Sequence, residues 1–447
     1  MKNRLRFILI LIALFLTAAC LTNPARENLK QGDMYQDQKQ WDKAIAEYDQ
    51  AIEVDPKPAQ AYASRALAYT MKGEFDKAVA DCDKAIELAP KFAEAYATRG
   101  RAYTGKGDLD KAVADCDRAI ELDPKLAQAY ANRGGAYAAK VEFDKAIADC
   151  DKAIELGSNF ALTYYTRGLG YHGKGELDKA TADYDRAIEL DPELAQVYLF
   201  RGVIYADKGD FDKAIADLDK AIALAPNLAQ AYAHRGSAYA AKGEFDKAIA
   251  DCDKAIELAP DFALSYFTRG RAYHAKGEFD KAIADCDKTI ELVPNFAQAY
   301  VNRGGAYIEK GDLDKAIADL DKAIELAPNL PLAYNNRGLA YYTKGDFDKA
   351  IADFDKAIEL APNLPQAYNN RGRAYYEKGD FDKAIADYDK AIELYPGYDF
   401  AYYCRAHAHA AKGEVVEAVN DFKKCIEITR VPALAETAQQ ELAKLEP

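Results

Sequence analysis

Tyrosine, alanine and glycine recur along the chain at helical spacing, in pairs of stripes separated by polar residues. In residues 229–262, Tyr232, Gly236 and Tyr239 lie four and three residues apart, and a second stripe of similar spacing starts at Ala248. Residues at this spacing share one face of an α-helix. The pattern therefore predicts two antiparallel helices that meet along these stripes, with Gly236 and Ala248 where the backbones approach closely.

Residues typical of turns follow each predicted helix. Gly243 suits a left-handed conformation at the end of the first helix, acidic Glu244 suits the start of the second, and Pro260 cannot continue it. A single hairpin of this size buries too little apolar surface to be stable alone. Neighbouring hairpins are therefore expected to stack.

The hairpin pattern repeats every 34 residues and makes twelve units from Ala25 to Pro432. A proline stands near the end of ten units, at Pro56, Pro90, Pro124, Pro192, Pro226, Pro260, Pro294, Pro328, Pro362 and Pro396. Each unit resembles the tetratricopeptide repeat, whose signature positions in one unit hold Tyr232, Gly236, Tyr239, Ala248, Cys252, Ala255 and Pro260.

The resemblance implies an all-α fold, a right-handed superhelical solenoid of twelve tetratricopeptide hairpins over residues 25–432. Beyond them, Leu434, Ala438 and Leu442 lie at helical spacing. This spacing predicts a C-terminal capping helix over residues 433–447, with a polar outer face.

One repeat position departs from the family, where leucine is common. It holds arginine in eleven units, at Arg65, Arg99, Arg133, Arg167, Arg201, Arg235, Arg269, Arg303, Arg337, Arg371 and Arg405. The same units have an aspartate sixteen residues later, as in Arg235 with Asp251, whereas the first unit has Gln31 and Glu47. This joint presence predicts a hydrogen-bonded pair between the two helices of each hairpin, which is architecture and not a ligand site.

The fourth hairpin departs from the pattern at both of its turns. Val141 replaces the glycine between its helices, and Gly157-Ser158 replaces the stretch that elsewhere ends in proline. If the turn requires a left-handed residue, a β-branched side chain is strained there. We expect this hairpin to be the weakest.

Residues 1–19 have the features of a secretory signal peptide. Lys2, Arg4 and Arg6 precede an apolar run that ends in small residues at Ala19. The mature chain is therefore expected to be exported.

The sequence Leu-Thr-Ala-Ala-Cys at residues 16–20 resembles the lipobox of bacterial lipoproteins. The resemblance implies that Cys20 is lipidated and becomes the N-terminus, with residues 20–24 as a linker. Leu21, not an acid, follows the cysteine, which by resemblance to enteric sorting favours the outer membrane over the inner, on the periplasmic side. Two alternatives remain: conventional cleavage near Ala19, which would give a secreted protein, and an uncleaved anchor, for which the apolar stretch is shorter than the roughly 20 residues that span a bilayer.

Charge and composition exclude several classes of function. The formal net charge of −14 repels phosphate backbones, so no nucleic-acid partner is expected. With five histidines and no serine in a nucleophile elbow, the sequence predicts no enzyme, and it indicates no cofactor or metal. Gly168, Gly170 and Gly173 match a dinucleotide fingerprint, but they lie within a predicted helix without a preceding strand and are interpreted as coincidence.

The cysteines have a structural interpretation. Five of them share one repeat position, which holds bulky apolar or aromatic residues elsewhere, and are expected to fill the core: Cys82, Cys116, Cys150, Cys252 and Cys286. Cys404, His407, His409 and Cys425 gather in the last hairpin. His407 and His409 are two residues apart on a helix and point to different faces, which favours structure over metal binding.

In tetratricopeptide domains the first helices of successive hairpins line a concave channel for peptides or helices. The lysine–asparagine pair with which one subfamily grips a terminal carboxylate is absent from the matching positions. The position that forms an asparagine ladder in O-linked N-acetylglucosamine transferases holds Asn132, Asn302, Asn336 and Asn370 here. Asparagine amides can hold a peptide backbone whatever its side chains, but asparagines that are solvated or hydrogen-bonded within the helix are equally ordinary on an exposed helix face.

The candidate peptide-binding residues are Asn302, Asn335, Asn336, Asn369 and Asn370, together with the nearby Tyr342 and Tyr376. We expect the side chains of Asn302, Asn336 and Asn370 to be exposed. The predicted function is a non-enzymatic scaffold that binds protein or peptide segments, as an adaptor tethered in a bacterial envelope. The alternative is a structural or self-associating spacer without a dedicated peptide ligand.

Overall fold

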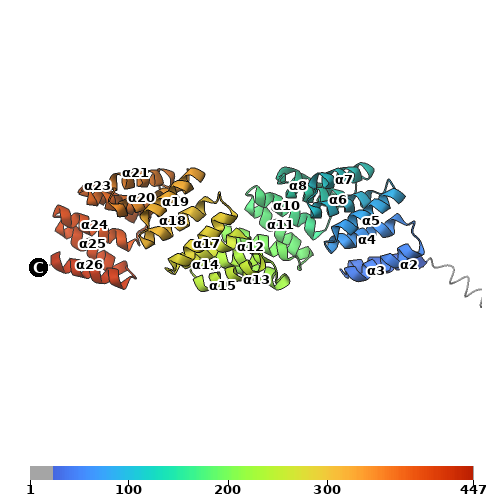
Figure 1. The fold of residues 1–447 in the computed structure, drawn as a ribbon, viewed down its shortest axis with the longest axis horizontal. Helices are drawn as coiled ribbons and strands as arrows, with labels where there is room; N and C mark the ends of the chain where they lie inside the picture. Colours follow the sequence, from blue (N-terminus) through green and yellow to red (C-terminus); the bar gives the residue numbers. More distant parts are fainter. Residues whose placement is uncertain (1–23, 446–447) are drawn as a thin grey trace, which may run out of the picture. The chain divides into compact units, whose positions relative to one another are not determined.

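The computed structural model describes residues 24–445, and every regular element among them is an α-helix, which confirms the all-α prediction (Figure 1). The described chain divides into two compact units, up to Ala225 and from Pro226. The residues of the predicted signal, including Cys20, lie outside the described range.

Unit 1 contains six helical hairpins, each made of two consecutive helices. Their bounds are α2 (Pro24–Asp37), α3 (Trp41–Val54), α4 (Ala59–Met71), α5 (Phe75–Leu88), α6 (Ala93–Lys106), α7 (Leu109–Leu122), α8 (Ala127–Ala139), α9 (Phe143–Glu155), α10 (Ala161–Gly173), α11 (Leu177–Leu190), α12 (Ala195–Asp207) and α13 (Phe211–Leu224).

Unit 2 contains six more hairpins and a last helix. Their bounds are α14 (Ala229–Ala241), α15 (Phe245–Leu258), α16 (Ala263–Ala275), α17 (Phe279–Leu292), α18 (Ala297–Lys310), α19 (Leu313–Leu326), α20 (Pro331–Lys344), α21 (Phe347–Leu360), α22 (Pro365–Glu377), α23 (Phe381–Leu394), α24 (Asp399–Lys412), α25 (Val415–Ile428) and α26 (Pro432–Leu445).

The small residues of the repeat lie where the two helices of a hairpin cross. A methyl group built at Gly236 in α14 would lie only 3.0 Å from Sγ of Cys252 and 3.1 Å from the carbonyl oxygen of Ala248, both in α15. Ala248 and Cys252 are fully buried. The close approach therefore requires a small residue, as the spacing predicted, and Ala66 and Ala406 hold the same position in two other hairpins.

The turn between the helices of a hairpin requires a left-handed residue. Gly243 has φ +78°, and Val141 at the same repeat position has φ +62°. Val141 is also 67% exposed, so its side chain gains little from packing. The strain predicted for the fourth hairpin is thus present in its backbone.

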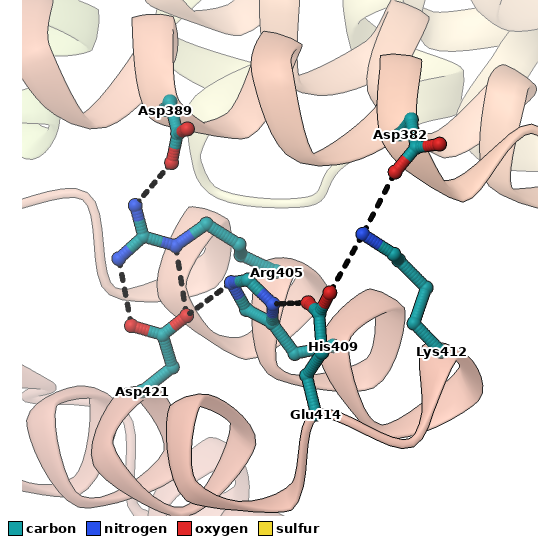
Figure 2. A network of polar contacts seen from close by, with 7 residues as sticks. All are labelled: Asp382, Asp389, Arg405, His409, Lys412, Glu414 and Asp421. Atoms are coloured by element: carbon teal, nitrogen blue, oxygen red, sulfur yellow. Dashed lines mark hydrogen bonds and ion pairs between the residues drawn. The ribbon is translucent and has the colours of Figure 1, made fainter.

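The predicted arginine–aspartate pair is present in all eleven hairpins, with both carboxylate oxygens of the aspartate bound. In the last hairpin, Nε and Nη2 of Arg405 donate to Asp421 at 2.8 and 2.7 Å (Figure 2). The other ten pairs make the same two hydrogen bonds: Arg65–Asp81, Arg99–Asp115, Arg133–Asp149, Arg167–Asp183, Arg201–Asp217, Arg235–Asp251, Arg269–Asp285, Arg303–Asp319, Arg337–Asp353 and Arg371–Asp387.

These arginines also join neighbouring hairpins within each unit, which the sequence analysis did not foresee. The remaining Nη1 of Arg405 donates to Asp389 of the preceding hairpin, and a second link runs from Lys412 to Asp382 (Figure 2). The aromatic rings of Tyr232 and Tyr239 flank the guanidinium of Arg235 at 5.6 and 6.0 Å. Repeated down a unit, the two links set the register of stacked hairpins.

Helix α26 covers the open end of the last hairpin. Leu434, Leu442 and Leu445 pack against the buried Ala406 and Phe422 of α24 and α25. The position of this helix agrees with the predicted cap.

Candidate peptide-binding surface

The candidate asparagines lie on α18, α20 and α22, the first helices of three successive hairpins in unit 2. The expectation that Asn302, Asn336 and Asn370 are exposed is wrong. Asn335 and Asn369 are buried, at 7% and 1% exposure, and the other three are half-buried. The reason is that the first helices of successive hairpins contact one another, and these positions lie between them.

The asparagines of the predicted ladder do not form equivalent contacts. In unit 1, Nδ2 of Asn132 donates to the carbonyl oxygen of Ala97 on the preceding first helix at 2.8 Å. In unit 2, Nδ2 of Asn370 donates to Oδ1 of Asn335 at 3.2 Å, and Asn335 in turn donates to Oδ1 of Asn336 at 3.2 Å. Two of the ladder amides therefore already bind neighbouring helices.

Asn302 is the exception among them. Its Nδ2 is buried and has no hydrogen-bond partner in the described residues. Phe267 is the residue before Asn302 that corresponds to Ala97 before Asn132. Its ring packs against that of Phe296, with the ring centroids 4.7 Å apart. The amide of Asn302 is thus a donor without an acceptor.

The two candidate tyrosines are half-buried at the ends of their helices. Tyr342 packs on Phe347 and Tyr376 on Phe381, with ring centroids 5.7 and 5.4 Å apart. The guanidinium of Arg373 lies 4.6 Å from the centre of the Tyr342 ring. Burial raises the pKa of Tyr342 against the opposing effect of Arg373, so its hydroxyl stays protonated at neutral pH.

Arg271, His274 and Gly305, which lie beside Asn302, were not predicted from the sequence. A pocket of about 150 Å³ opens between α16, α18 and α20, and is lined by Arg271, His274, Val301, Asn302, Gly305 and Asn336. The signal that could have found it is the repeat position that holds both Arg271 and Gly305, where leucine or valine stands in several other units. A cation in one hairpin beside a missing side chain in the next predicts a polar recess.

Other sequence features have structural roles. The five cysteines at one repeat position are buried thiols, which confirms them as core residues. In the last hairpin the ring of His407 packs against Phe422, whereas His409 binds Glu414 at 2.6 Å (Figure 2). Within residues 24–445 no three histidine, cysteine or acidic side chains are grouped to hold a metal ion.

The glycine fingerprint has a packing explanation. Gly168, Gly170 and Gly173 all lie in α10, as predicted. A methyl group at Gly168 would meet the ring of Tyr184, and one at Gly173 would meet the ring of Phe143. These glycines therefore make room for neighbouring side chains.

Family models match most of the chain. Three models described as tetratricopeptide repeat match residues 59–92, 93–126, 127–159, 229–262, 263–296, 335–399 and 369–424, and one described as TPR repeat matches 32–73, 170–209, 202–243 and 304–345. The matches cover more than half of the 447 residues. The chain belongs to the tetratricopeptide-repeat family.

One solved structure agrees with this assignment at the level of fold, and two others are similar at lower TM-scores. The crystal structure of the APC/C hetero-tetramer Cut9–Hcn1 has 16% identity and a TM-score of 0.55, over 96% of this chain and 98% of that chain. Yeast Tom70 has 21% identity and a TM-score of 0.42, over 94% and 95%. A tetratricopeptide-repeat protein from Parabacteroides merdae has 22% identity and a TM-score of 0.46, over 56% and 98%. No curated protein matches the chain.

The fold is typical of scaffolds for protein–protein interaction, and it suggests a protein or peptide partner. None of the helices in the described part of the chain is both long and apolar enough to cross a membrane.

Proposed function

We propose that this tetratricopeptide-repeat protein is a non-enzymatic adaptor that binds an extended segment of a partner protein along α18, α20 and α22. The observation that carries the proposal is the amide of Asn302, a buried donor without an acceptor at the start of a row of asparagines. A buried polar group is normally hydrogen-bonded, and an unpaired one marks a place for a missing partner. A peptide carbonyl oxygen would supply that acceptor.

The neighbouring side chains suit a peptide as well. Tyr342 and Tyr376 are half-buried on the same first helices and offer apolar rings with hydroxyl groups. The backbones of successive first helices lie less close to one another from α16 to α24 than among α4, α6 and α8. An extended segment needs a continuous helix face.

The proposal includes a place in the cell. Because residues 1–20 resemble a lipoprotein signal, the adaptor would be exported and held by lipid on Cys20, on the periplasmic side of a bacterial envelope. The outer membrane is the favoured location. A tether of this kind would keep the scaffold beside envelope proteins.

The experiment is a pull-down of partners from the native envelope, followed by titration of the captured partner against Asn302→Ala. Since Asn302 Nδ2 makes no internal hydrogen bond, this change should leave thermal stability unaltered. Loss of one hydrogen bond to the partner should weaken binding by about 0.5–1.5 kcal/mol, roughly two- to tenfold in Kd.

Asn132→Ala is the matched control. It stands at the same repeat position in unit 1 but loses its bond to Ala97, so it should lower stability and leave affinity unchanged. Equal affinity of wild type and Asn302→Ala would remove this surface from the binding site. Light scattering of the same samples tests the spacer alternative, which expects self-association and no captured partner.

A further inference from the structure

The pocket between α16, α18 and α20 exists because one side chain is missing. A methyl group built at Gly305 would lie 3.7 Å from Nε2 of His274 and 3.8 Å from Nδ2 of Asn336, at ordinary contact distance. Leu169 and Leu339 occupy the same repeat position in other hairpins. Gly305 therefore leaves open a space that a leucine would fill.

Two nitrogen atoms around this space have no hydrogen-bond partners. Nε2 of His274 and Nδ2 of Asn302 are both buried and have no partner in the described residues. The ring of His274 is held against Phe279 at a centroid distance of 5.4 Å. Two unsatisfied nitrogens at one small pocket are costly unless an acceptor enters it.

Arg271 adds the only positive charge among the pocket-lining residues. Its guanidinium lies 5.9 Å from the ring of Phe267, and no carboxylate of residues 24–445 pairs with it. By contrast, Arg269 on the same helix binds both Asp253 and Asp285. In a chain with 73 acidic residues, an arginine left without one is available to an external anion.

We propose that this pocket binds a carboxylate of the partner segment, so that the scaffold selects an acidic residue at one fixed point. This inference rests on the proposed function, because the carboxylate belongs to a segment lying along the first helices. One guanidinium charge balances one carboxylate, and the amide and imidazole N–H groups can donate to its remaining lone pairs. A doubly charged phosphate would exceed the single positive charge of the pocket.

The test starts from a display library of random linear peptides selected on the full-length protein in detergent micelles. We expect the selected peptides to share an aspartate or glutamate at one position. In the best binder, changing this acid to its amide should raise Kd at least tenfold. An amidated C-terminus on the same peptide shows whether an internal acid or the terminal carboxylate is bound.

Two protein variants locate the effect. Gly305→Leu should fill the pocket and raise Kd at least tenfold while the melting temperature holds, since leucine is native at this position elsewhere. Gly135→Leu is the matched control, because it has the same repeat position in unit 1 and nothing within 4 Å of an added methyl. With Arg271→Gln, the acid and amide peptides should bind equally.

Each other result is decisive. If the selected peptides show no acidic preference, or if Gly305→Leu and Arg271→Gln leave Kd unchanged, the carboxylate pocket is wrong, while an effect of Asn302→Ala would still support peptide binding. If no peptide is selected and no partner is captured, both proposals fail.

Discussion

At the residue scale, Val141 is the clearest case of local strain. A β-branched residue in the left-handed region costs about 1–2 kcal/mol, partly offset by the greater chain entropy that glycine loses on folding. We therefore expect Val141→Gly to stabilise the fourth hairpin by about 0.5–1 kcal/mol. Hydrogen exchange of α8 and α9 would measure the gain.

The reverse change provides the control for this prediction. Gly243→Val introduces the same side chain at a similar positive φ in another hairpin and should destabilise it by a similar amount. Faster exchange in Val141→Gly would mean that the fourth hairpin has adapted to valine.

His407 predicts a pH dependence of stability. Burial against Tyr403 and Phe422 lowers its pKa below the ordinary value, an effect that Glu441 opposes and Lys444 reinforces. The unfolded chain therefore takes up a proton at a higher pH than the folded one. The stability due to neutral His407 is complete above about pH 6.5 and is lost as the pH falls toward the folded pKa.

The test replaces this imidazole by a ring that cannot titrate. His407→Phe should flatten the fall in the free energy of unfolding between about pH 7 and pH 5, relative to wild type. Urea melts at several pH values would measure it. Parallel curves for the two proteins would show that His407 contributes nothing to acid sensitivity.

At the scale of elements, the arginine–aspartate pair within a hairpin and the lysine–aspartate link between hairpins differ in energetic importance. Asp319 is 8% exposed and takes two bonds from Arg303, whereas the side chain of Asp280, which binds Lys310, is 86% exposed. Removing one partner of a buried ion pair costs about 3–5 kcal/mol, and an exposed pair contributes at most about 1 kcal/mol. Arg303→Leu should thus be far more destabilising than Lys310→Ala.

Because repeat proteins unfold in parts, this comparison needs a local measurement. Hydrogen exchange of α18 and α19 should rise strongly in Arg303→Leu and hardly at all in Lys310→Ala. Similar protection in both variants would mean that the arginine–aspartate pairs give register without stability.

At the scale of the whole molecule, the N-terminal segment predicts a membrane tether. We expect the mature chain to begin at Cys20, to incorporate a labelled fatty acid in a bacterial host, and to partition into detergent. Cys20→Ala should abolish incorporation. A fully labelled Cys20→Ala protein would show that the lipid is attached to another residue.

Much of the fold could be predicted because each 34-residue unit repeats the same local physics. The positions of Gly236 and Ala248 indicated the helix crossing, Gly243 the left-handed turn, and Arg235 with Asp251 the pair across the hairpin. All of these contacts form within one hairpin, between residues that the helical period alone brings together.

The candidate site could be predicted only in part. Its helices follow from the repeat, but the exposure expected for Asn302, Asn336 and Asn370 was wrong, and the roles of Arg271, His274 and Gly305 were missed. These features depend on how closely the first helices of neighbouring hairpins approach, and the sequence of one hairpin does not state that distance.

The amino-acid sequence by itself therefore determined the hairpins, their number and their internal pairs, since these depend on short-range spacing and side-chain size. The tertiary structure alone decided which asparagines are already bound. Small Ala97 lets Asn132 reach a backbone carbonyl, whereas Asn302, which follows a hairpin with Phe267, keeps a free amide. The packing of α16 against α18 also places Gly305 beside His274 and leaves the pocket open. Side chains from successive repeats meet there, and their joint packing decides which space remains empty.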